Sequence, residues 1–127
     1  MTEVLESAPT TVGAFTGRHA IAELEGVAAV LLDDERLLID VLTSALDRAG
    51  ATILDITSKK FEPQGVTVLA LLSESHASLH TYPEIGAAFM DVFTCGHRAD
   101  PEHVVHLVAE ALRAPAVELK TICRGKE

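Results

Sequence analysis

The sequence has few aromatic residues and few cysteines. It contains no tryptophan, one tyrosine and four phenylalanines in 127 residues, so it offers no aromatic platform on which the bases of a single-stranded nucleic acid would stack. Two cysteines are too few for a disulfide framework, and we expect both thiols to be reduced. The sequence has no run of roughly 18 apolar residues, so it predicts no membrane span.

Basic residues are scarce as well. Ten Lys and Arg stand against nineteen Asp and Glu, which gives a net charge of −9 and disfavours nucleic acid and anionic membranes as partners. Residues 1–14 contain acids and no basic segment, so we expect a flexible leader and not a signal peptide. Residues 15–127 then form a single domain, which we expect in the cytoplasm.

Hydrophobic residues make up 48% of the chain, and their spacing predicts an α+β fold. Helical periodicity follows a cap at Asp33 or Asp34 and ends at Gly50, and a second helix runs from Asp100-Pro101 to Pro115. Residues 26–32 are ambiguous between the end of a strand and the lead-in to a helix. Strands are predicted at 15–25, 51–62, 66–72, 75–82, 87–95 and 116–123.

We summarise this pattern as β-α-β-β-β-α-β, with two helices and about five strands. It predicts a two-layer α/β sandwich, a mostly antiparallel sheet with both helices on one face. Apolar residues occur on both faces of the middle strands, so we expect the second face to be covered by the sheet of a partner chain. The expected assembly is a homodimer.

Reactive side chains are concentrated between Leu71 and Gly96, and the pair Glu74-Ser75 has a specific chemical potential. A serine hydroxyl can attack the carbonyl of the preceding residue and turn the peptide into an ester. Elimination at the serine Cα then breaks the chain and leaves dehydroalanine, which hydrolyses to a pyruvoyl group. This ketone forms a Schiff base with an amine substrate and draws electrons from it. An isolated Glu-Ser pair is usually only structural, so the neighbouring residues decide.

Two neighbours suit this chemistry. His80 is a candidate base because histidine titrates near neutral pH, and Cys95 is a candidate proton donor. Taken singly, each residue type is more often a satisfied polar side chain or a packing residue. Ser75 and His80 are five residues apart, so strict alternation places them on opposite faces of a strand. Either a bulge intervenes, or His80 acts on Ser75 of another subunit.

Three separated motifs, together with two shorter matches, resemble the bacterial S-adenosylmethionine decarboxylase proenzymes. The resemblance covers most of the segment from Phe15 to Cys123. It implies a self-processing, pyruvoyl-dependent decarboxylase that supplies the aminopropyl donor for polyamine synthesis, and a dimer with active sites at the interface. The motifs are Ser73-Glu74-Ser75-His76, His80-Thr81-Tyr82-Pro83-Glu84 and Asp91-Val92-Phe93-Thr94-Cys95-Gly96, with Gly17-Arg18-His19 and Pro63-x-Gly65-Val66 as the shorter matches.

The resemblance also implies roles for processing and catalysis. Cleavage falls between Glu74 and Ser75, and Ser75 becomes the pyruvoyl group. His80 matches the processing histidine, and Thr67 stands where the family usually has a serine that assists processing. Cys95 matches the residue that protonates the substrate carbon after carbon dioxide has left.

The substrate-binding roles implied by the resemblance fall on three residues. Phe61 and Tyr82 match aromatic positions of the adenine site, and Glu84 matches the acid that binds the ribose hydroxyls. Tyr82 replaces a common tryptophan, which makes the aromatic wall smaller and more polar. Phe61 together with Glu84 favours a substrate that carries a nucleoside.

Three alternatives remain open at this stage. Some relatives decarboxylate L-ornithine or L-arginine, and an unprocessed, non-catalytic relative would act as a partner subunit. A protein of another class would bind zinc through His76, His80, Cys95 and His97, whose residue types suit the metal although their spacing is not diagnostic. In the decarboxylase interpretation we assign no metal ligands, and the only cofactor is the pyruvoyl group.

Overall fold

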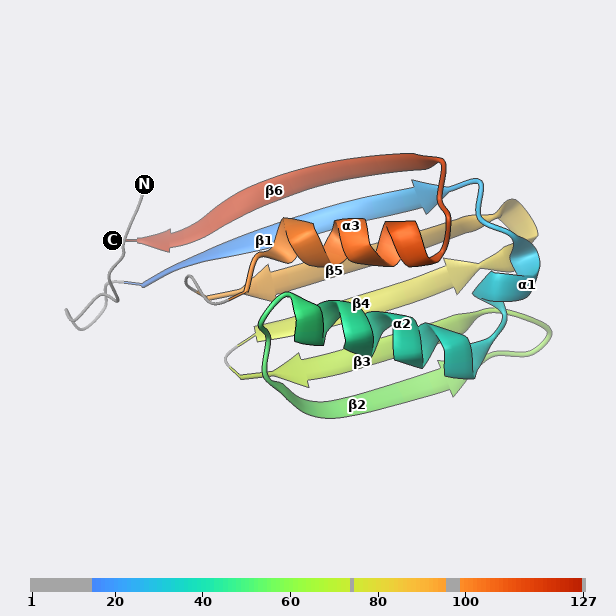
Figure 1. The fold of residues 1–127 in the computed structure, drawn as a ribbon, viewed down its shortest axis with the longest axis horizontal. Helices are drawn as coiled ribbons and strands as arrows, with labels where there is room; N and C mark the ends of the chain where they lie inside the picture. The colour runs from blue at the N-terminus through green and yellow to red at the C-terminus, as the bar shows by residue number, and fades with distance from the viewer. Residues whose placement is uncertain (1–14, 74, 96–98, 127) are drawn as a thin grey trace.

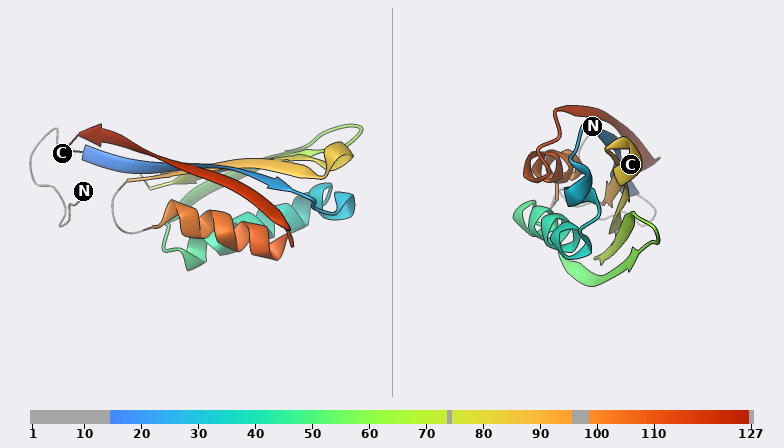
Figure 2. Two further views of the ribbon diagram at one scale, coloured as in Figure 1. Left: turned by 90° about the horizontal axis from the view of Figure 1, so that it is seen from above. Right: turned by 90° about the vertical axis from the view of Figure 1, so that its right-hand side faces the viewer.

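The structure is a computed structural model that describes residues 15–73, 75–95 and 99–126. These residues form a six-stranded sheet in the order β2-β3-β4-β5-β1-β6, and every neighbouring pair is antiparallel. The main helices α2 and α3 lie side by side across one face of the sheet (Figures 1 and 2). The elements are β1 (Phe15–Glu25), α1 (Ala29–Leu32), α2 (Glu35–Arg48), β2 (Ile53–Lys60), β3 (Val66–Leu72), β4 (Ser75–Tyr82), the 3₁₀ turn η1 (Pro83–Ile85), β5 (Ala87–Thr94), α3 (Pro101–Ala111) and β6 (Ala116–Lys126).

The predicted α+β sandwich with helices on one face is confirmed. The summary string β-α-β-β-β-α-β undercounts the strands, because four strands, β2 to β5, follow one another between the main helices. The ambiguous segment 26–32 ends in the short helix α1. The last strand continues to Lys126 because its whole length pairs with β1, a long-range contact that local periodicity does not report.

Capping residues and apolar stripes explain the two main helices. Asp34 precedes α2, and its side chain accepts a hydrogen bond from the Leu37 amide at 3.1 Å. Asp100 caps α3 in the same way, and Pro101 occupies the first helical position, where its missing N–H costs nothing. Each helix then buries one apolar stripe against the sheet, namely Leu38, Leu42, Ala45 and Leu46 in α2 and Val104, Val105, Leu107 and Val108 in α3.

Alternation along the strands separates a covered face from an open face. In β4, Ala77 and Leu79 point into the core beneath the helices. Ala20, Val92, Ala77 and Ala70 are partners across four adjacent strands, and their small side chains let the helices approach the sheet closely. The hydrophobic core therefore lies entirely between the helices and this covered face.

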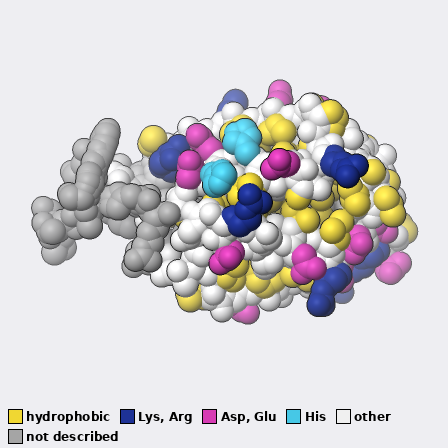
Figure 3. Space-filling model, viewed as in Figure 1, with side chains coloured by type: hydrophobic (Ala, Val, Ile, Leu, Met, Phe, Trp, Pro, Cys, Tyr) yellow, Lys and Arg dark blue, Asp and Glu magenta, His cyan; other side chains and the backbone are white. Residues whose placement is uncertain are grey.

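The two main helices lie on one side of the sheet and leave its other face open (Figure 2), where large apolar side chains are exposed. On the opposite side of the molecule, acidic and basic side chains are interspersed over the outer surface of the helices (Figure 3), as expected of a surface that faces water. Within the described residues, no helix combines the length and the apolar character needed to cross a membrane. The exposed apolar residues of the open face are Ile21, Leu69, Leu71, Phe89 and Ile122.

Candidate active site

A cavity of about 330 Å³ lies at the end of the sheet where β4 finishes and β3 begins. Its lining comes from the turn before β3, from β3 and β4, and from η1. The antiparallel pairing of β3 with β4 sets Thr67 opposite His80, and η1 brings Glu84 back to the same place. Of the residues singled out in the sequence, the structure gathers five around this cavity: Phe61, Thr67, His80, Tyr82 and Glu84.

Thr67 and His80 are in direct contact within the cavity. The Thr67 Oγ1 and His80 Nδ1 atoms lie 2.9 Å apart, and both side chains are partly exposed. The two residues proposed from the sequence to assist processing therefore form one hydrogen-bonded unit. Beside them, the rings of Tyr82 and Phe89 pack with centroids 4.9 Å apart, so the ring of Tyr82 is supported from the neighbouring strand.

An aspartate beneath the cavity braces the turn that carries Phe61. Asp33 Oδ1 accepts hydrogen bonds from Lys60 Nζ at 3.0 Å and from the Gly65 amide at 2.9 Å, and the Phe61 amide donates to the Gly65 carbonyl at 2.8 Å. The Gly65 hydrogen bond and the Lys60 contact hold the pKa of Asp33 below its ordinary value. Gly65 has a φ of 103°, a backbone conformation that favours glycine.

The other predicted residues lie at the opposite end of β4. Ser75 is the first residue of that strand, and its hydroxyl donates to the Ser73 carbonyl at 3.2 Å. Cys95 follows directly after β5, and the pairing of His76 with Phe93 brings the start of β4 and the end of β5 together. Glu74, the other side of the expected cleavage point, lies outside the described residues.

The distance between these two groups exceeds the reach of a side chain. Ser75 and His80 are five residues apart in a regular strand, which corresponds to about 16 Å. The pairing of β4 with β3 and β5 continues without a register shift, so no bulge brings the two residues onto one face. The first of the two explanations considered from the sequence is therefore excluded within this strand.

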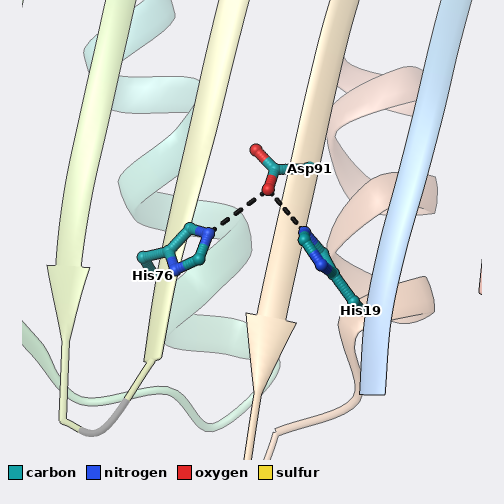
Figure 4. Close-up of side chains that lie close together, drawn as sticks. All are labelled: His19, His76 and Asp91. Carbon is teal, nitrogen blue, oxygen red and sulfur yellow. Dashed lines mark hydrogen bonds and ion pairs between the residues drawn. The ribbon is translucent and has the colours of Figure 1, made fainter. Parts of the chain in front are cut away.

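A cluster that the sequence did not single out lies on the open face, near the Ser75 end (Figure 4). Asp91 Oδ2 is 2.6 Å from His19 Nε2 and 3.3 Å from His76 Nε2, while Ser78 donates to Asp91 Oδ1. Burial acts to raise the pKa of Asp91, but the hydrogen bonds from Ser78, His19 and His76 outweigh it and keep that pKa below its ordinary value. The carboxylate therefore stays charged among donors from the two strands that flank β5, namely β1 and β4.

Among the described residues, the structure does not bring together the ligands of the zinc site considered from the sequence. His76 and His80 both belong to β4 and are four residues apart, or about 13 Å, which is too far for the two side chains to share one ion. His97 lies outside the described residues. Among the described residues, the group whose ligand atoms converge is instead His19, His76 and Asp91, with these atoms within 4.8 Å of one another.

The fold and the cavity are those of a small α+β enzyme. Its polar reactive side chains lie on the uncovered face of the sheet. The family model for S-adenosylmethionine decarboxylase matches residues 18–125. The S-adenosylmethionine decarboxylase proenzyme of Parasynechococcus marenigrum is 48% identical over 108 residues, which are 85% of this chain and 84% of the relative. That of Methanococcus maripaludis is 44% identical over 109 residues, covering 86% and 89% of the two chains.

A solved structure agrees with the sequence comparisons. The crystal structure of the adenosylmethionine decarboxylase from Aquifex aeolicus superposes with a TM-score of 0.83 at 30% identity, over 90% of this chain and 94% of that one. The chain belongs to the S-adenosylmethionine decarboxylase family. The family resemblance drawn from the motifs is thereby confirmed.

Proposed function

We propose that this protein cleaves itself between Glu74 and Ser75 and then decarboxylates S-adenosylmethionine, forming the aminopropyl donor for polyamine synthesis. The observation that carries the proposal is the cavity at the end of β4, where five residues from four segments converge. Phe61 and Tyr82 offer flat faces for an adenine ring, and the Glu84 carboxylate accepts hydrogen bonds from ribose hydroxyls. These features suit a nucleoside better than a free basic amino acid.

The residues around Ser75 fit the formation of a pyruvoyl group. The hydroxyl of Ser75 is directed back along the chain by its hydrogen bond to the Ser73 carbonyl. The Thr67–His80 pair supplies a base whose Nδ1 is already oriented by a hydroxyl. In this scheme His80 removes the Cα proton of Ser75 during the elimination that breaks the chain. Thr67 holds the imidazole ring of His80 in position.

The pyruvoyl group supplies a carbonyl that binds the substrate amine covalently and draws electrons away from the bond to the departing carboxylate. The chain's own residues do the rest. Phe61, Tyr82 and Glu84 bind and orient the nucleoside. Cys95, at the Ser75 end of the sheet, then donates a proton to the substrate carbon from its thiol.

This division of labour requires two copies of the chain. Ser75 lies about 16 Å and Cys95 about 20 Å along the sheet from His80 and the cavity. The open face between these two ends exposes apolar side chains. A second copy packed in the opposite direction over the open face buries those side chains and places its Ser75 end beside the cavity of the first. We therefore propose a homodimer whose two active sites each use residues of both copies.

The proposal is tested first by the mass of the purified protein under denaturing conditions. We expect two fragments, residues 1–74 and 75–127, the second beginning with a pyruvoyl group. Release of carbon dioxide is then measured with S-adenosylmethionine, L-ornithine and L-arginine, and only the first is expected to react. Ser75→Ala is expected to remain one chain without activity. Wild-type protein that stays uncleaved, or Ser75→Ala that still decarboxylates, contradicts the proposal.

Shared sites are tested by mixing two defective chains. Cys95→Ala impairs the Ser75 end and Glu84→Gln impairs the cavity, so each homodimer is expected to be nearly inactive. A dimer with one copy of each has one intact site, and random mixing during co-expression is expected to restore about a quarter of wild-type activity. No recovery, despite mixed dimers detected by two affinity tags, means that each site belongs to one chain.

A further inference from the structure

Self-cleavage has a mechanical consequence for β4. Before the cut, the start of β4 is tied covalently to β3 through residue 74. After it, Ser75 is a chain terminus, and the ends of strands are where local opening costs least. The pyruvoyl carbon would then lie at a free strand end, although the reaction requires it at a fixed position. The first side chain behind that end is His76.

We propose that Asp91 and His19 form an anchor that grips His76 and holds the new terminus of β4 in place once the chain has been cut. The inference rests on the proposed self-cleavage and assigns these residues a positioning role, because none of them touches the reacting atoms. Asp91 lies on β5, beside His76, and His19 lies on β1, on the far side of β5 (Figure 4). The anchor thus ties the start of β4 to its neighbour β5 and to β1, the strand beyond it.

The hydrogen bonds leave little freedom to the carboxylate. One Asp91 oxygen accepts from both imidazoles, at 2.6 Å for His19 and 3.3 Å for His76, and the other accepts from Ser78. His19 is the best-buried member, with 17% of its side chain exposed, against 48% for His76. The short hydrogen bond to the less exposed His19 therefore fixes the carboxylate, which in turn accepts a hydrogen bond from the more exposed His76.

The partner of His19 Nδ1 determines which of the two ring nitrogens carries the proton. Arg124 Nη1 lies 3.4 Å from His19 Nδ1, and a guanidinium only donates, so Nδ1 offers its lone pair and the ring proton is on Nε2. That proton points at Asp91. A metal ion on Nε2 would require the opposite tautomer, with an N–H facing the guanidinium. The cluster is consequently built for hydrogen bonding and not for coordination.

The ring of Phe93 packs against both histidines of the anchor. The ring of Phe93 lies 5.5 Å from that of His19 and 5.8 Å from that of His76, centroid to centroid, and Arg124 stacks over it at 5.1 Å. A phenylalanine at position 19 would keep this packing and lose the N–H that faces Asp91, together with the weaker contact of Nδ1 with Arg124. His19→Phe is therefore the variant that separates the anchor from the stability of the sheet. His19→Gln retains a side-chain N–H and is the matched rescue.

The test is hydrogen exchange at the first amides of β4, residues 76–78, in two backgrounds. In processed protein, His19→Phe is expected to speed exchange about tenfold, the effect of losing one hydrogen bond to a charged group. In uncleaved Ser75→Ala protein the same substitution is expected to change exchange less than about twofold, because the covalent tether remains. The kcat of processed His19→Phe is expected to fall about tenfold with little change in KM, and His19→Gln is expected to restore both readouts.

The outcomes separate this inference from the proposed function. Wild-type protein that does not cleave refutes the self-processing on which the anchor depends. Where the wild type cleaves, equal acceleration in both backgrounds makes His19 an ordinary structural residue, and no acceleration in processed protein removes the anchor. A His19→Phe chain that cannot cleave places its role before the cut and also overturns the proposal. Asp91→Asn, which preserves volume, is measured in parallel and is expected to behave as His19→Phe does.

Discussion

The covered and open faces of the sheet are made of alternate residues of the same strands, yet their compositions differ sharply. In β4, Ala77 and Leu79 face the helices and are buried, whereas His76, Ser78 and His80 face the other way. The covered face completes the hydrophobic core within one chain. The open face combines hydrogen-bonded polar side chains with exposed apolar ones, a mixture typical of surfaces that bind a partner.

This difference shows how a small domain separates stability from chemistry. A slip of one residue in β4 would exchange the two faces, so the packing of Leu79 against the helices also fixes the register of His80 with Thr67. Substitutions on the open face are therefore expected to impair function while leaving the fold intact. Substitutions on the covered face are expected to do the reverse.

The largest effect is expected from His80→Ala, which removes the base from the open face. Self-cleavage is expected to stall, leaving an intact chain or an ester, because no base then remains beside Thr67 to take the Cα proton of Ser75. Mass measurement over time detects this. The control is His103→Ala, since His103 is exposed on α3 and far from the open face. Efficient cleavage by His80→Ala would remove His80 from the processing mechanism.

Cys95→Ala is expected to cut normally and to turn over slowly. Loss of a positioned proton donor typically lowers kcat by about 10²–10⁴, whereas the steps that break the chain do not require the thiol in this scheme. Single-turnover decarboxylation of the processed protein provides the measurement. Cys123→Ala is the matched control because Cys123 is exposed on β6. A Cys95→Ala protein with normal turnover would refute the assignment.

Matched leucines compare the two faces directly. Leu79 is fully buried on the covered face, and Leu71 is 56% exposed on the open face. Leu79→Ala is expected to lower the free energy of unfolding by about 2–5 kcal/mol, and Leu71→Ala by less than about 1 kcal/mol in dilute protein. Leu71→Ala is instead expected to weaken dimerisation, measured by sedimentation. Equal destabilisation of dilute protein by both would contradict the division between the faces.

The sequence predicts the elements well because their signals are local. Asp34 and Asp100 mark helix starts, and Pro63 with Gly65 marks the turn before β3, so the segments that converge on the cavity are placed correctly along the chain. The family resemblance then implies roles for Phe61, Thr67, His80, Tyr82 and Glu84, which the structure brings together around the cavity. Their chemical roles remain predictions that the experiments above test.

The strand order is what the sequence does not predict. β1 comes first in the chain but pairs with β5 and β6, which come last. His19 lies next to Asp91 only because β1 is placed between β5 and β6 in the sheet. The two residues are 72 positions apart, so no local pattern in the sequence predicts their contact. A pattern of one histidine in each of two strands and an aspartate in a third becomes meaningful once the order β4-β5-β1 is known.

The smallest expected effect is a change in the free energy of unfolding at low pH, which depends on the protonation of Asp91. Its pKa is lower in the folded chain than the ordinary value of 3.8, so on acidification the unfolded chain takes up the proton first. The stabilisation from Asp91 is therefore complete above about pH 4 and declines as the pH falls through the lower, folded pKa. The free energy of unfolding is measured against pH in the uncleaved Ser75→Ala background, which keeps the protein a single chain.

Asp91→Asn cannot bind that proton, so we expect its stability to lie below that of the parent at neutral pH and the gap to narrow below about pH 4. Ser78→Ala removes one donor to the same carboxylate. The difference in stability between Ser78→Ala and the parent is also expected to shrink below about pH 4, but by a smaller amount. A constant gap across the pH range would mean that the carboxylate gains nothing from its neighbours. The open face would then hold His19 and His76 by ring packing alone. The hydrogen bonds that distinguish it from the covered face would contribute nothing to the free energy of unfolding.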